Sequence, residues 1–79
     1  MDVFQEGHRF QFGKNVPAVV EKAVDSSLGL YLCVYLQNNM KVVRDQFTFD
    51  GEEWHLPDEP SGRVLRYAEE VRFLGLLKR

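Results

Sequence analysis

The side chains of residues 30–56 alternate with a period of two, and two turn dipeptides, Asn38-Asn39 and Asp50-Gly51, interrupt the alternation. Alternation of this kind, bounded by such dipeptides, is typical of antiparallel strands joined by tight turns. The pattern predicts three strands, at about residues 30–37, 41–49 and 53–56.

Both faces of the first predicted strand are largely apolar. Tyr31, Cys33 and Tyr35 share one face, and leucines and a valine occupy the other. Something must therefore cover each face. In the second strand, Asp45 shares its face with valine and phenylalanine side chains.

Residues 16–25 can be interpreted as a helix or as a strand. The apolar positions follow one face of a 3.6-residue helix: Val16, Val19, Val20, Ala23 and Val24. Asn15 is suited to an N-cap, Pro17 to the first turn and Gly29 to a left-handed C-cap. Four valines favour a strand, but a strand would place apolar residues side by side and break the alternation. We therefore predict a helix here, preceded by a short strand at residues 8–12.

The segment from Ser61 to the C-terminus predicts a second helix. An apolar stripe recurs at helical spacing: Val64, Tyr67, Ala68, Val71 and Leu74. Further apolar residues, Phe73, Leu76 and Leu77, widen this stripe around much of the helix near its end. Either this tail docks on its own domain or it meets a partner.

The predicted order is β-α-β-β-β-α, an α+β fold in which two helices pack on a three- to four-stranded antiparallel sheet. Residues 1–79 form a single domain, with residues 1–7 as a loosely tied terminus. If residues 16–25 are a strand instead, the alternative is an SH3-like small β-barrel with a C-terminal helix.

From residue 16 onward, the predicted order resembles the α-β-β-β-α order of double-stranded RNA-binding domains. The resemblance is one of topology only, and it implies nucleic-acid binding. Such domains usually carry a lysine cluster at the start of the last helix, where this chain has Ser61-Gly62-Arg63.

The composition is that of one small globular domain. The 79 residues are 44% hydrophobic and 28% charged, and six Phe, three Tyr and one Trp supply much of the core area. A chain of this length is near the lower limit for folding unaided. The single cysteine excludes an intramolecular disulfide framework. Without a signal-like start, or an apolar run of roughly 18 residues, a cytoplasmic protein with no membrane contact is expected.

Charge is distributed unevenly along the chain. The net charge is −2, and residues 45–59 hold six acidic residues and no Lys or Arg. The acidic balance argues against general nucleic-acid affinity, which relies on neutralising phosphates. Five of these residues form a predicted acidic edge: Asp50, Glu52, Glu53, Asp58 and Glu59. Their spacing does not fit a calcium loop, so we expect them to attract a protein partner with a basic surface.

Two further groups suggest a nucleic-acid-binding module as the alternative function. Tyr31 and Tyr35 could stack bases on the sheet, unless a helix or a second subunit covers them. Arg63 and Arg66 lie three apart on the predicted helix and could converge on one phosphate or carboxylate.

Residues that could carry catalysis or bind a metal are sparse. Cys33 lies mid-strand with no helix N-terminus or neighbouring cation to activate it, and His8 and His55 are too far apart in the chain for a zinc motif. No enzyme activity, metal or cofactor is expected.

The leading hypothesis is a small non-catalytic interaction module, regulatory or inhibitory, that binds another protein through the acidic edge. The apolar surplus would supply a second contact for a partner or for self-association as a homodimer. Its residues are Tyr31, Tyr35, Phe73, Leu76 and Leu77.

Overall fold

The computed structural model describes residues 3–37 and 39–77. Asn38 of the predicted Asn38-Asn39 turn therefore lies outside the described residues. Within them the chain forms six strands, a short 3-10 helix and one α-helix. These elements are β1 (Arg9–Phe12), β2 (Val16–Asp25), η1 (Ser26–Leu28), β3 (Leu30–Leu36), β4 (Val42–Phe49), β5 (Trp54–His55), β6 (Arg63–Val64) and α1 (Tyr67–Leu77).

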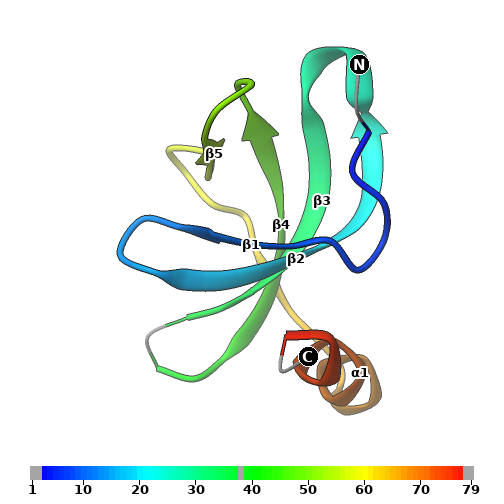
Figure 1. Cartoon of the computed structure of the whole chain (residues 1–79). Helices are drawn as coiled ribbons and strands as arrows, with labels where there is room; N and C mark the ends of the chain where they lie inside the picture. The colour runs from blue at the N-terminus through cyan, green and yellow to red at the C-terminus, as the bar shows by residue number, and fades with distance from the viewer. Residues whose placement is uncertain (1–2, 38, 78–79) are drawn as a thin grey trace.

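The strands form one antiparallel sheet that curls into a half-barrel. Neighbours follow the chain from β1 to β5, and β6 pairs with β4 beside β5. Figure 1 shows β1 and the segment before it crossing over the other strands, with α1 lying below β2 in this view. The edges β1 and β5 approach each other through side chains: the rings of Phe10 and Trp54 stack with centroids 4.0 Å apart.

The fold prediction of a three- to four-stranded sheet with two helices is wrong, because residues 16–25 form β2. The pairing of β2 with β3 brings Val19 opposite Val34 and Val20 opposite Cys33. The apolar neighbours that seemed to exclude a strand reflect burial on both faces. Val19 belongs to the cluster under α1, whereas Val20 belongs to the cluster inside the half-barrel.

Two register shifts further obscure the alternation in β2. They lie between Val20 and Lys22 and between Ala23 and Asp25, and each inserts an extra residue that moves later side chains to the other face. The alternative prediction, an SH3-like small β-barrel with a C-terminal helix, took residues 16–25 as a strand. The observed sheet around this strand is a half-barrel. The likeness to the α-β-β-β-α order of double-stranded RNA-binding domains fails, because the residues expected to form its first helix are the strand β2.

Gly29 adopts the left-handed conformation that its sequence context predicted, but it caps η1 and not a long helix. Its φ is 71°, and its N–H donates to the Ser26 carbonyl. A Cβ atom at this position would overlap the Phe49 carbonyl oxygen. The glycine thus lets the start of β3 approach the end of β4.

The C-terminal helix begins later than the sequence suggests. Arg63 and Val64 pair with β4 as β6, and α1 starts at Tyr67. Phe73 on its inner face is fully buried against Val19, Val34 and Val42 of the sheet. No helix among the described residues is both long and apolar enough to cross a lipid bilayer.

Candidate functional site

The five residues of the predicted acidic edge flank β5, the last strand in the order of the sheet. Three of them, Asp50, Glu52 and Glu53, lie in the turn between β4 and β5, and Asp58 and Glu59 follow β5. All five side chains are exposed. β5 pairs with one strand, β4, so the carboxylates lie at one end of the strand order of the sheet.

Asp50 organises the turn that carries this acidic edge. Its Oδ1 accepts hydrogen bonds from the backbone N–H groups of Glu52 and Glu53, at 2.8 and 2.7 Å. These N–H donors and the His55 ring lower the pKa of Asp50 to about 2, with the Glu53 N–H as the largest cause. The carboxylate is therefore ionised throughout the neutral range.

Asp50 also contacts the end of β5. Its Oδ2 lies 2.7 Å from His55 Nε2, and Glu53 brings a third potential ligand atom within 4.8 Å of both. All three side chains are exposed, and the hydrogen bond between Asp50 and His55 accounts for their closeness. The expectation that this chain has no metal site stays a prediction.

The acidic edge borders a pocket at the seam of the half-barrel. The pocket has a volume of about 410 Å³. Gln11, Phe12 and Gly13 line it from the side of β1, and residues 52–55, the end of the turn together with β5, line the other side. The two edges are held together by the stacking of Trp54 on Phe10.

The apolar residues predicted to bind a partner lie inside the fold. Tyr31 and Tyr35 are 2% and 4% exposed in the half-barrel, where they pack edge-on against aromatic rings. Phe73 is fully buried, and Leu76 and Leu77 are half-buried against the same cluster. The large apolar side chains that α1 leaves exposed are those of Tyr67, at 82%, and Val71.

The two arginines predicted to grip an anion do not share a helix. Arg63 lies in β6 and is exposed, whereas Arg66 precedes α1 and donates its backbone N–H to Glu69 Oε2 at 3.4 Å. Their convergence was expected from a helical spacing, and residues 63–66 are not helical. The buried Tyr31 and Tyr35 likewise offer bases no stacking surface.

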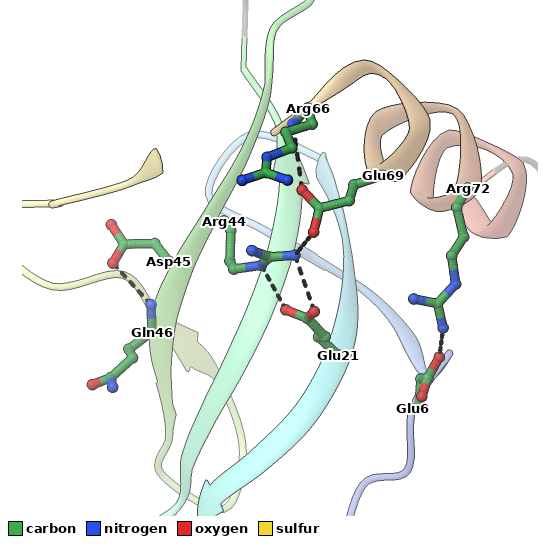
Figure 2. A network of polar contacts seen from close by, with 8 residues as sticks. All are labelled: Glu6, Glu21, Arg44, Asp45, Gln46, Arg66, Glu69 and Arg72. Atoms are coloured by element: carbon green, nitrogen blue, oxygen red, sulfur yellow. Dashed lines mark hydrogen bonds and ion pairs between the residues drawn. The ribbon is translucent and has the colours of Figure 1, made fainter. Parts of the chain in front are cut away.

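Sequence reasoning missed an ion network that joins the sheet to α1. Arg44 on β4 binds Glu21 on β2 through two contacts, Nε to Oε2 at 2.7 Å and Nη2 to Oε1 at 3.1 Å, and reaches Glu69 on α1 at 3.1 Å. Figure 2 shows Arg44 between these two carboxylates. Burial alone would lower the Arg44 pKa, but Glu69 and Glu21 outweigh it and raise that pKa.

The sequence analysis placed Asp45 on an apolar face but gave it no role, and it is the one buried charged residue in the described part of the chain. Figure 2 shows its carboxylate pointing away from the Arg44 network. The available signal was its place on an apolar face of β4, between Val43 and Phe47. A carboxylate in such a position has to be hydrogen-bonded or paired.

Cys33, the single cysteine of the chain, is poorly placed to act as a nucleophile. Cys33 is fully buried, and burial together with the charge of Glu21 raises the pKa of its thiol, so it stays protonated. A thiol in this state is not nucleophilic.

Comparison of the chain with protein families, with curated proteins and with solved structures finds no match.

Proposed function

We propose that this protein is a small non-catalytic interaction module that binds a basic protein through its acidic edge. The observation that carries the proposal is the grouping of five exposed carboxylates around β5, the strand at one end of the order of the sheet. No Lys or Arg occurs between residues 45 and 59. A partner with clustered lysines or arginines would be attracted to this edge and oriented by it.

The rigidity of the turn supports the same proposal. The Asp50 carboxylate accepts hydrogen bonds from within the turn and contacts His55 of β5. Among the described residues, the side chains of Glu52 and Glu53 form no hydrogen bond or ion pair. Those two side chains are free to pair with a partner. A preorganised surface loses less conformational entropy on binding than a loop that must first be ordered.

The test compares capture of proteins from the source cell by three forms of the chain. They are the wild type, the double variant Glu52→Lys with Glu53→Lys, and the control Glu70→Lys, which adds positive charge on α1 instead. Mass spectrometry identifies the captured proteins, and nuclease treatment removes those held through nucleic acid. We expect basic proteins whose capture falls at least about tenfold in the double variant and falls with added salt.

The control defines the outcome that contradicts the proposal. Glu70→Lys should keep its partners, because it leaves the acidic edge intact. Equal capture by all three forms would show that the acidic edge is not the binding surface. Capture that disappears after nuclease treatment would point to nucleic acid, which the buried Tyr31 and Tyr35 do not favour.

Self-association and a cytoplasmic location stay predictions. A homodimer would use the outer face of α1, where Tyr67 and Val71 lie four residues apart on one side of the helix. Phe73, Leu76 and Leu77 pack toward the sheet.

A further inference from the structure

Leu28 is a large apolar residue that the fold leaves exposed at one end of the half-barrel. It is the last residue of η1, the connection between β2 and β3, and it is 65% exposed. Figure 1 shows the start of the chain beside this connection, and Phe4 lines one pocket together with Leu28. Val3, the chain neighbour of Phe4, is exposed as well. Apolar side chains that are exposed together are typical of binding surfaces.

The pocket that Phe4 and Leu28 share lies at the end of the aromatic core inside the half-barrel. Its volume is about 730 Å³, against about 410 Å³ for the pocket at the seam. Phe4 and Phe49 form one wall with ring centroids 4.9 Å apart, and the buried Tyr31 closes the inner end. Pockets of this size, with apolar and aromatic walls, bind ligands in the mouths of other barrels. We call it the mouth pocket, and its main lining residues are Phe4, Leu28, Tyr31, Phe49, Asp50 and Gly51.

Asp50 gives the mouth pocket an acidic rim. It is the one charged residue among the described residues that line the pocket, and its carboxylate is ionised in the neutral range. Asp50 also belongs to the acidic edge, and Gly51 connects it directly to Glu52 and Glu53. The mouth pocket and the acidic edge therefore form one continuous surface. Its charge is complementary to that of a basic partner.

An aromatic side chain is the occupant that these walls favour. Aromatic rings attract one another edge-on or offset, and Phe4, Tyr31 and Phe49 supply three of them. At protein interfaces, aromatic side chains seated in pockets supply much of the binding energy, and the charges around them orient the partner. We propose that the mouth pocket binds an aromatic side chain of the basic partner, one that is flanked by the lysines or arginines that pair with Glu52 and Glu53.

This inference rests on the proposed function for its basic partner, and peptides test it separately. The protein, labelled with ¹⁵N, is titrated with a short Gly/Ser peptide whose centre is lysine-phenylalanine-lysine. Matched peptides replace the phenylalanine by alanine or both lysines by glutamate. The backbone amides of Gly29 and Gly51 report on the mouth pocket, and those of Glu52 and Glu53 report on the acidic edge. Nuclear Overhauser contacts between the peptide ring and the Leu28 methyl groups locate the ring.

We expect the phenylalanine peptide with two lysines to shift all of these amides in a saturable way, with its ring in contact with the Leu28 methyl groups. The alanine peptide should bind at least about tenfold more weakly, the loss that follows removal of an aromatic anchor. It should shift mainly the amides of Glu52 and Glu53. The glutamate peptide should also bind at least about tenfold more weakly, because the acidic rim repels it.

A pair of variants checks the position of the site. Leu28→Ala shortens the exposed wall of the mouth pocket and should weaken binding of the phenylalanine peptide at least about threefold. Val64→Ala is the matched control, because Val64 on β6 is also 65% exposed and does not line the pocket. It should change the affinity less than about twofold. Equal effects of the two substitutions would count against the proposal.

Equal affinities of the phenylalanine and alanine peptides would overturn the proposal, as would amides of Gly29 and Gly51 that do not shift. Shifts confined to Glu52 and Glu53, together with capture of basic proteins that depends on them, would reject the mouth pocket and retain the proposed function. Selective binding of the phenylalanine peptide without such capture would do the reverse. Shifts of the Gly29 and Gly51 amides on dilution of the protein alone would identify a second copy of the chain as the occupant and overturn the proposal.

Discussion

Three aspartates of this chain each accept a hydrogen bond from a backbone N–H that follows them. Asp25 binds the N–H of Ser27 at 3.1 Å, Asp45 that of Gln46 at 2.8 Å and Asp50 that of Glu52 at 2.8 Å. Each bond satisfies a donor that no strand partner reaches. At the scale of the residue, an acidic side chain here both shapes the local backbone and contributes charge.

Replacing Asp50 should change stability in a way that depends on pH. Its pKa is lowered from 3.8 to about 2 in the folded protein. The carboxylate therefore stabilises the fold above the unfolded value, and this contribution is lost as the pH falls through the folded value. Asp50→Ala should unfold at a lower temperature than the wild type near neutral pH, and the difference should shrink steadily toward about pH 2.

Thermal unfolding followed by circular dichroism across this range measures the effect. Asp50→Asn serves as the control, because its amide oxygen can still accept the Glu52 and Glu53 N–H groups while the charge is removed. It should lie between the wild type and Asp50→Ala. A difference that is the same at both ends of the pH range would contradict the assigned cause.

At the scale of the element, α1 is held in place by apolar packing on the sheet and by two ion pairs. Phe73 packs on Val19, Val34 and Val42, and Glu69 pairs with Arg44. Arg72 pairs with Glu6 of the segment before β1. The helix thus joins residues from both ends of the chain and covers the face of the sheet opposite the aromatic cluster.

Phe73→Ala should destabilise the fold by about 3 to 5 kcal/mol, because it removes a fully buried ring and leaves a cavity. In a domain this small, that loss is a large share of the total stability. Val71→Ala on the exposed side of the same helix should stay within about 0.5 kcal/mol of the wild type. Urea unfolding distinguishes the two. If Phe73→Ala were as stable as Val71→Ala, α1 would not be packed on the sheet through Phe73.

At the scale of the molecule, side chains close the half-barrel where backbone pairing does not. Phe10 of β1 stacks on Trp54 of β5. Phe4, before β1, contacts Tyr31, Phe49 and Trp54 with ring centroids 4.9 to 5.5 Å apart. Aromatic residues bury the largest areas, so these few rings bring the two edges of the sheet together.

Trp54→Ala should therefore weaken the whole fold and not only β5. We expect a loss of about 2 kcal/mol, smaller than for a fully buried tryptophan because Trp54 is half-buried. Trp54→Phe keeps a ring against Phe10 and should lose less than half as much. Chemical denaturation followed by far-UV circular dichroism gives both values. Equal stability of Trp54→Ala and the wild type would show that the stack does not hold the seam.

The quality of sequence prediction follows from how many faces of an element are buried. The alternation of residues 30–56 located β3, β4 and β5, because the turn signals between them are local. The same reasoning failed at β2, where burial on both faces and two register shifts produced spacing typical of a helix. For the candidate site, the acidic run was evident in the sequence, but the interior position of Tyr31 and Tyr35 was not.

The sequence by itself determined the strands with local turn signals, the left-handed Gly29 and the concentration of acidic residues between 45 and 59. Each of these depends on neighbouring residues or on composition. Only the tertiary structure decided that residues 16–25 are a strand, that Phe73 faces the sheet and that Asp45 is buried. Those outcomes depend on contacts between segments far apart in the chain, and a linear pattern does not record which face a distant element will cover.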